Sequence, residues 1–246
     1  MDPAGCADPL STSWKPWPAR SGAKVVFLPG ERVAAERIAR RLFQRPLETW
    51  EYAGLAGAPD NAVVEVGASG GKLYIEIGDP AAATYRGYYY VRRAATHLVV
   101  INDGFHIPLH RLQRRGLGLC ILHRQVSAAA ALRVDRIEVV AGRRRGENGY
   151  YTWPRFGFEG ALPARLRRML PIGLRKATTI LDLMECPRGR TWWRENGVTI
   201  GAAFDLLAGS RSRSVLDRYV QAKINAANGT KTNLENRAAI SYGNVR

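Results

Sequence analysis

Between residues 97 and 142 the chain alternates strand-like and helix-like patterns in a fixed order. A β-strand is expected for "HLVVINDGFHI", a helix for "GLCILHRQVSAAAAL" and a second strand for "RIEVVAG". Further strand patterns precede this passage, and a short helix pattern follows it. Strands and helices in this order bury their apolar sides against one another, which predicts an α/β fold with a mixed sheet.

Earlier patterns extend the expected sheet towards the N-terminus. The sequence predicts strands over residues 23–30, 61–67, 72–79 and 87–93, and an amphipathic helix over residues 31–45. The two strands that flank "ASGG" are expected to form a β-hairpin. Its inward-pointing residues should include Val64, Val66, Tyr74 and Ile77.

The two ends of the chain differ in composition from its middle. Residues 1–23 are rich in Pro, Ser, Gly and Ala and are expected to form a flexible leader before a domain over residues 24–170. Residues 171–246 are expected to form a helical C-terminal extension with a mobile tail. Helical patterns in "GLRKATTILDLMEC" and "RSVLDRYVQAKI" support this division.

The cysteines and the apolar runs indicate where in the cell the protein would be found. Cys6, Cys120 and Cys186 are far apart and odd in number, so they form neither a metal-binding set nor a disulfide framework, and no metal is expected. Cys120 lies in an apolar helical pattern and should be buried. No apolar run is long enough to span a bilayer, and the N-terminus does not resemble a secretory signal. These features favour a cytoplasmic protein with no membrane partner.

The formal net charge of +16 is the strongest compositional feature, and it comes mainly from arginine. A field of this sign attracts nucleic acid, acidic proteins, anionic membranes or polyanionic small ligands. The codon usage of a GC-rich genome explains part of the arginine excess equally well. The charge therefore suggests a class of partner, with nucleic acid among the candidates, and no chemistry.

Gly116 and Gly118 lie between a strand pattern and a helix pattern, where they would form the mouth of the helix. The N–H groups of a first helical turn have no intrahelical partners, and glycines let an anion approach them closely. Such a turn is therefore an anion site, most often for phosphate. A dinucleotide fingerprint does not fit because Ile121 replaces the third glycine, and no P-loop lysine follows. A capping turn without a ligand is the alternative.

Two motifs in this region carry a resemblance. The segment from Gln113 to Gly118, "QRRGLG", matches the pattern Gln/Arg-x-x-Gly-x-Gly/Ala. About 30 residues later, "ENGYYTWPRFGF" contains Asn148 and an aromatic segment that ends in Gly-Phe. In the content, order and spacing of these motifs the chain resembles the GNAT superfamily of N-acetyltransferases, over roughly residues 24–162. The resemblance implies a central, mostly antiparallel sheet flanked by helices.

The resemblance also implies a cofactor, which is acetyl-CoA or another acyl-CoA. In the family, the pyrophosphate binds to backbone N–H groups of the glycine loop, and an asparagine lies beside the pantetheine arm. The strand before the loop, here residues 102–107, would splay from its neighbour and pair its free backbone groups with this arm. The cofactor-binding residues would then be Gln113, Arg114, Arg115, Gly116, Leu117, Gly118 and Asn148.

The resemblance identifies the catalytic groups less clearly than the cofactor-binding residues. Acyl transfer needs a base for the amine and an acid for the leaving thiolate. Many family members use a tyrosine as the acid, but Trp153 occupies the matching position here. Tyr151 and Tyr150, two and three residues earlier, are the alternative acids. The candidate bases are Glu138, His106 and Asp103, and each also has a structural explanation, such as a solvent-facing position in a strand for Glu138.

Together these features predict an enzyme, an acyl-CoA-dependent N-acyltransferase that acts on an amine. The positive charge argues against a polycationic acceptor and favours RNA or a nucleic-acid-associated acceptor. The alternative is a catalytically inactive GNAT-like protein that binds nucleic acid or a coenzyme. Trp153 at the usual tyrosine position and the long C-terminal extension favour that alternative.

Overall fold

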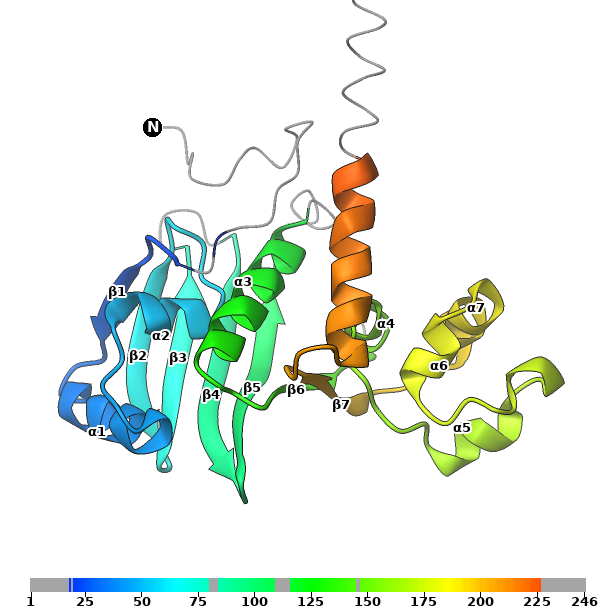
Figure 1. The fold of residues 1–246 in the computed structure, drawn as a ribbon, viewed down its shortest axis with the longest axis horizontal. Helices are drawn as coiled ribbons and strands as arrows, with labels where there is room; N and C mark the ends of the chain where they lie inside the picture. Colours follow the sequence, from blue (N-terminus) through cyan, green and yellow to red (C-terminus); the bar gives the residue numbers. More distant parts are fainter. Residues whose placement is uncertain (1–17, 19, 80–83, 109–115, 145–146, 227–246) are drawn as a thin grey trace, which may run out of the picture.

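The computed structural model describes residues 18, 20–79, 84–108, 116–144 and 147–226. In this part of the chain seven strands form one sheet, and their spatial order follows the sequence (Figure 1). The strands are β1 (Lys24–Phe27), β2 (Val63–Ser69), β3 (Lys72–Gly78), β4 (Arg86–Ala94), β5 (His97–His106), β6 (Arg136–Ala141) and β7 (Ile200–Asp205). The helices are α1 (Arg32–Phe43), α2 (Thr49–Leu55), α3 (Leu117–Ala131), α4 (Gly149–Arg155), α5 (Ala164–Met169), the 3₁₀-helix η2 (Ile172–Leu174), α6 (Ile180–Met184), α7 (Pro187–Asn196) and a C-terminal helix over residues 211–226.

The sheet is mixed, and the predicted α/β class is confirmed. β2 to β5 form an antiparallel meander, and β7 is antiparallel to β6. β1 is parallel to β2, and β5 is parallel to β6. Parallel neighbours need a crossover connection, and α3 is the crossover between β5 and β6.

The β2–β3 hairpin forms where the sequence predicts it. Ser69 pairs with Lys72, and the two residues between them, Gly70 and Gly71, have φ angles of 55° and 73°. A two-residue turn with both φ angles positive matches the twist of the flanking strands, and glycine adopts it without steric cost. The glycines therefore set the register of the hairpin.

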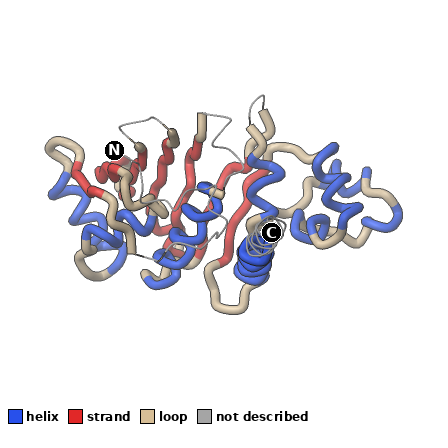
Figure 2. Tube along the Cα trace, turned by 90° about the horizontal axis from the view of Figure 1, so that it is seen from above, coloured by secondary structure: helices blue, strands red, loops and turns tan. Residues whose placement is uncertain are grey.

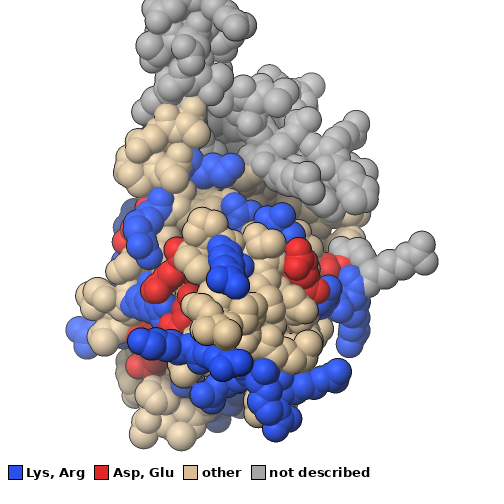
Figure 3. All heavy atoms as spheres, turned by 90° about the vertical axis from the view of Figure 1, so that its right-hand side faces the viewer, with Lys and Arg blue, Asp and Glu red and all other residues tan. Residues whose placement is uncertain are grey.

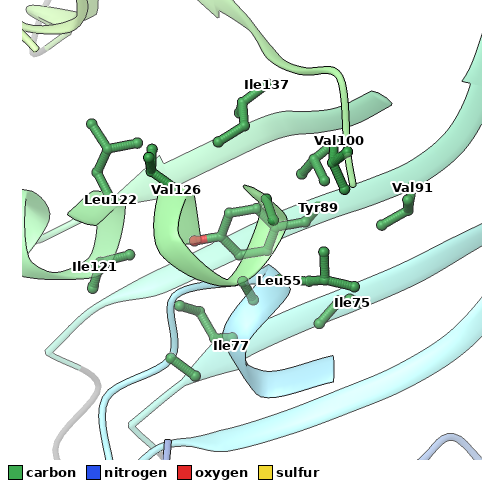
Figure 4. Packing of buried hydrophobic residues seen from close by; sticks show 14 of the residues in the cluster. Leu55, Ile75, Ile77, Tyr89, Val91, Val100, Ile121, Leu122, Val126 and Ile137 are labelled. Atoms are coloured by element: carbon green, nitrogen blue, oxygen red, sulfur yellow. The ribbon is translucent and has the colours of Figure 1, made fainter. Parts of the chain in front are cut away.

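The main hydrophobic core lies on one face of the sheet, under α1, α2, α3 and the C-terminal helix (Figures 1 and 2). Figure 4 shows Ile75, Ile77 and Tyr89 of the sheet near Leu122 and Val126 of α3. The sheet thus buries alternate residues of each strand, as a half-covered sheet must. Cys120 is buried beside this core, as the sequence predicts.

The hairpin prediction is correct for three of its four inward residues. Val64, Val66 and Ile77 are fully buried. The prediction is wrong for Tyr74, which is only partly buried and donates a hydrogen bond from its hydroxyl to Glu76 (2.7 Å). Successive side chains of a strand point to opposite faces, so the burial of Leu73, Ile75 and Ile77 turns Tyr74 to the other face.

A second hydrophobic cluster lies beside the sheet, on the right of Figure 1. We call residues 162–196, which include α5, η2, α6 and α7, the helical unit. Trp193 is fully buried in it, and its indole N–H donates a hydrogen bond to the carbonyl of Tyr150 in α4 (2.8 Å). The other buried members of the cluster are Leu162, Leu166, Leu170, Leu174, Ala177, Ile180 and Leu183.

The helical unit is inserted between β6 and β7, so the predicted boundary at residue 170 does not match the structure. The small cluster already begins at Leu162, and β7, within the predicted helical extension, pairs with β6 over its whole length. The helix predicted for "GLRKATTILDLMEC" is wrong in its first part, because α6 begins only at Ile180. There Thr179 and Asp182 form a capping box that starts the helix.

The predicted leader and tail fall largely outside the described residues, which exclude residues 1–17 and 227–246. The last residues of the leader are an exception. Ser21 is buried and donates a hydrogen bond to the carbonyl of Ala58 (2.8 Å). The chain is therefore anchored to the fold a few residues before β1.

Arg211, at the start of the C-terminal helix, joins this helix to the helical unit. Its guanidinium lies 2.9 Å from Glu159, 2.8 Å from Asp182 and 2.7 Å from Glu185. Partial burial raises the pKa of the Asp182 carboxyl, but hydrogen bonds from two backbone N–H groups and from Arg211 outweigh it. That pKa therefore lies well below its usual range, and the carboxylate stays charged at neutral pH.

Candidate functional site

β5 and β6 part in the middle of the sheet. Their parallel pairing ends at Asn102 and Val139. Beyond this point β5 continues to His106 and pairs only with β4, while β6 continues to Ala141 and pairs only with β7. We call this break in the pairing the opening. Among the residues that the structure describes, the β6-facing edge of the last residues of β5 has no strand partner.

A β-bulge in β5 lies where the strands part. Tyr88 and Tyr89 of β4 are consecutive, but they pair with Gly104 and Asn102, so Asp103 is an extra residue in β5. A bulge of this kind bends the strand that carries it and increases the local twist. It explains why β5 turns away from β6 directly after Asn102.

Two buried amide side chains fix Asn102, the last residue of β5 that pairs with β6. Asn102 and Gln125 of α3 exchange two hydrogen bonds, Nδ2 to Oε1 (2.9 Å) and Nε2 to Oδ1 (3.0 Å). Gln125 also donates to the carbonyl of Leu55 in α2 (2.8 Å). A buried amide pair with satisfied hydrogen bonds is specific in orientation, so it fixes β5 against α3 beside the opening.

The mouth of α3 lies next to the opening. Gly116 precedes the helix with a φ angle of 93°, a conformation that favours glycine, and its carbonyl accepts the first helical hydrogen bond from Cys120 (3.0 Å). A Cβ at Gly118 would lie 3.6 Å from the ring of Phe105, in the part of β5 that pairs with β4 but not with β6. The first turn of α3 therefore packs against the side chain of Phe105, a residue of β5 beyond its pairing with β6. The predicted loop residues Gln113, Arg114 and Arg115 lie outside the described residues.

A pocket of about 400 Å³ opens beside the same point, on the other face of the sheet. Its walls come from three consecutive residues of each of β5, β6 and β7 (residues 101–103, 138–140 and 201–203) and from Glu159. Glu138 and Val140 alternate with the buried Ile137 and Val139, so their side chains lie on the face opposite to the main core. The polar residues that line it include three carboxylates, Asp103, Glu138 and Glu159. The apolar part of the wall includes Ile101, Val140 and Ala203. The mouth of α3 and the pocket thus lie on opposite faces, with the opening between them.

The three carboxylates differ in their partners. Glu138 lies 2.8 Å from Arg136 and 3.8 Å from Arg92, and Glu159 is paired with Arg211. Asp103 is exposed and forms no ion pair with any residue that the structure describes. Of the predicted bases, Glu138 and Asp103 are therefore in the pocket, and Asp103 is the one whose charge is not already matched.

The structure does not bring the predicted acids to this pocket. The hydroxyl of Tyr150 donates a hydrogen bond to the carbonyl of Arg194 in α7 (2.9 Å), and the hydroxyl of Tyr151 accepts one from the guanidinium of Arg194 (2.9 Å). Both rings pack against the small cluster of the helical unit. Their observed role is to join α4 to α7.

The other residues of the second motif are also held by local contacts. Trp153 packs edge-on against Phe158, with ring centroids 4.9 Å apart, as part of the main core. Asn148 is exposed at the start of α4, and its side-chain oxygen accepts a hydrogen bond from the Thr152 hydroxyl (2.5 Å). His106, at the end of β5, lines a separate depression with Glu65 and Glu76.

The bulge at Asp103 and the Asn102–Gln125 pair were not predicted from the sequence. The signal for the amide pair is the presence of two amide residues within apolar runs, in "VVIND" and "LHRQVS". Glu159 and Arg211 were missed as well, because their pairing joins segments that are 52 residues apart. No local pattern indicates such a contact.

Some classes of site are not found in the part of the chain that the structure describes. It contains no group of three or more His, Cys, Asp or Glu residues that could hold a metal ion. None of its helices combines the length and the apolar character that a membrane crossing needs. No protein-family model matches the sequence, and no curated protein matches it either. The chemistry of the site is therefore inferred from its own residues.

Proposed function

We propose that the protein is an acyl-CoA-dependent N-acyltransferase that uses acetyl-CoA or another acyl-CoA. The observation that supports this most strongly is the parting of β5 and β6 directly beside the mouth of α3. This arrangement offers an anion site, a strand edge with no β6 partner and a break in the pairing of the sheet within one region. An acyl-CoA has the matching parts in the same order, which are a pyrophosphate, an arm with amide groups and a thioester.

The residues present fit this coenzyme. The first turn of α3 would hold the pyrophosphate on backbone N–H groups, and the positive end of the helix dipole favours the negative charge. Gly118 carries no side chain in this first turn, where a Cβ would already lie 3.6 Å from the ring of Phe105. The free edge of β5 beyond Asn102 would pair with the amide groups of the arm, as one strand pairs with another. When bound, the coenzyme supplies an activated thioester.

The pocket on the other face would hold the acceptor amine. Carboxylates orient a cationic amine and can accept its proton, and Asp103 and Glu138 both line the pocket. The pocket therefore offers carboxylate groups to an amine, and the charge of Asp103 is not matched by an ion pair among the described residues. The proposal assigns no step to Tyr150 or Tyr151, since neither lines the pocket.

Binding of acetyl-CoA to the wild-type protein, measured by calorimetry, is the first test. We expect a dissociation constant in the micromolar range. Gly118→Glu should weaken binding about 100-fold or more, because it places a carboxylate and added bulk where the pyrophosphate would lie.

Gly118→Ala is the matched control for this variant. Its methyl group would make an ordinary contact of 3.6 Å with Phe105 and adds no charge, so binding should fall by less than about tenfold. Thermal unfolding checks that both variants are folded. A folded wild-type protein that does not bind acetyl-CoA, or equal binding by Gly118→Glu, would contradict the proposal.

Release of the thiol from acetyl-CoA in the presence of a panel of primary amines separates an enzyme from an inactive coenzyme-binding protein. With an amine that gives turnover, we expect the loss of the general base to lower the rate by about 10²–10⁴-fold. Asp103→Asn and Glu138→Gln are tested separately, and the base is the residue whose loss has the larger effect. Neither substitution should change the affinity for acetyl-CoA, because both residues lie on the far face of the sheet. Acetyl-CoA binding without turnover on any amine favours the inactive alternative.

A further inference from the structure

The helical unit carries a strong local excess of positive charge. Its 35 residues include eight Lys and Arg residues but only three Asp and Glu residues. Two of these acids, Asp182 and Glu185, are already paired with Arg211, which lies outside the unit. The excess is therefore not balanced by the acids of the unit itself.

The fold of α5 directs its arginines to the surface. Leu166 and Leu170 are buried in the small cluster, whereas Arg165, Arg167 and Arg168 are exposed. A helix with one buried face must place its remaining residues in solvent. The three arginines therefore project from the outer side of the unit.

Further basic residues from neighbouring segments lie close to η2. Arg175 and Lys176 follow η2 directly and are exposed. Arg188 of α7 is exposed too, and a Cβ at Gly173 in η2 would lie 3.1 Å from its guanidinium. Figure 3, which faces this end of the molecule, shows Lys and Arg side chains gathered in a band across its lower part.

We define the basic surface as Arg165, Arg167, Arg168, Arg175, Lys176 and Arg188. Within the described part of the chain none of the six forms an ion pair with a carboxylate. Other arginines of the protein are used internally. Arg190 and Arg194, for example, donate hydrogen bonds to Met184 and Tyr151. The six thus remain available to an external anion.

We propose that the basic surface binds the phosphodiester backbone of a nucleic acid. Five of its six residues are arginines, whose planar guanidinium group forms paired hydrogen bonds with phosphate oxygens. A row of phosphates is the anionic polymer that neutralises several separate cations at once, and release of its counterions drives the association. The binding is expected to depend on charge and to have little sequence preference.

The surface fits a nucleic acid better than a membrane. Membrane-surface helices insert an apolar face into the lipid, but the apolar face of α5 is already buried in the small cluster. Only Met169 and Ile172 are exposed large apolar residues in this region of the described chain. A nucleic acid requires no such insertion.

The surface is separate from the proposed coenzyme site. None of its six residues lines the pocket beside β5 and β6. Nucleic-acid binding can therefore be measured without coenzyme, and its failure would leave the proposed acyl transfer untouched.

Fluorescence anisotropy with a labelled 20-base-pair duplex of arbitrary sequence, as DNA and as RNA, is the test. The double variant Arg167→Gln/Arg168→Gln should raise the Kd roughly 10- to 60-fold at 0.1 M salt. The slope of log K against log salt should fall in magnitude by about 1.8, because each lost phosphate contact removes about 0.9. Comparison of the two duplexes shows whether DNA or RNA is preferred.

The matched control is Arg37→Gln/Arg40→Gln on α1, at the opposite end of the sheet in Figure 1. Both residues are exposed, and the change in net charge is the same. The control should leave the slope nearly unchanged. Equal weakening by the two double variants would mean that only net charge matters and would overturn the proposal. So would absence of binding at 50 mM salt, or an effect of Arg167→Gln/Arg168→Gln on anionic vesicles but not on nucleic acid.

Discussion

Replacement of Trp193 by alanine should lower the free energy of unfolding by about 3–5 kcal/mol. Among the described residues, Trp193 is the largest side chain that is fully buried, and its removal empties the centre of the small cluster. The substitution also removes the hydrogen bond that the indole N–H of Trp193 donates to the carbonyl of Tyr150. Urea denaturation followed by circular dichroism measures the loss, and the helical unit should unfold at a lower urea concentration than the sheet.

Trp192 provides the control for this variant. It is the preceding residue of the same helix but is only partly buried, at the edge of the cluster. Trp192→Ala should cost about 1 kcal/mol, in the usual range for a substitution outside the core. A cost for Trp192→Ala that equals or exceeds that of Trp193→Ala would show that the small cluster is not organised around Trp193.

Gly157→Ala should destabilise the protein by about 3 kcal/mol or more, through backbone strain and overpacking together. Gly157 follows α4 with a φ angle of 100°, a conformation that other residues rarely adopt. A Cβ there would lie 2.3 Å from the carbonyl oxygen of Ser212 and 3.1 Å from the ring of Phe204. Neither the first turn of the C-terminal helix nor β7 can move away without loss of its own contacts.

Gly201→Ala is the control for the glycine variant. Gly201 lies in β7, its φ angle is not in the left-handed region, and no atom lies within 4 Å of the position of a Cβ. Its substitution should change the free energy of unfolding by less than about 0.5 kcal/mol. If thermal unfolding gives the two alanine variants the same midpoint, the close approach at Gly157 does not constrain the fold.

The parts of the fold that the sequence predicts are those specified by local patterns. β2, β3, α3 and β6 each combine a clear hydrophobic period with glycine or polar boundaries. Tyr74 shows the limit of such reasoning, because its strand is predicted correctly but its burial is not. An aromatic residue suggests burial, but only the pairing of the strands with α-helices on one face decides which alternate residues are covered.

Two elements had no usable signal. α2 is short, and five of its seven residues are buried, so it lacks the polar face that marks an amphipathic helix. β7 consists of "IGAAFD", whose small residues have little strand propensity of their own. It becomes a strand because β6 offers a free edge. That edge lies 59 residues earlier in the chain, since Ala141 pairs with Ile200.

The candidate site was predictable in its glycine turn but not in its geometry. Gly116 and Gly118 indicate a helix mouth from their positions alone, because the reasons for them are local. The parting of β5 and β6 depends on the bulge at Asp103, which requires the register of β4. Likewise, Tyr150 and Tyr151 suggest catalysis until α7, about 40 residues later, is seen to engage both hydroxyl groups.

The late position of β7 also affects how the chain folds during its synthesis. β6 leaves the ribosome well before β7, and at roughly 5–20 residues per second the gap lasts about 3–12 s. Throughout this interval β6 is an edge strand whose open N–H and C=O groups can pair with another nascent chain. The helical unit, which is made in between, forms its own cluster and can cover part of this edge until β7 arrives. Slow elongation between β6 and β7, or a high concentration of nascent chains, should therefore increase the aggregation of incomplete chains that end before β7.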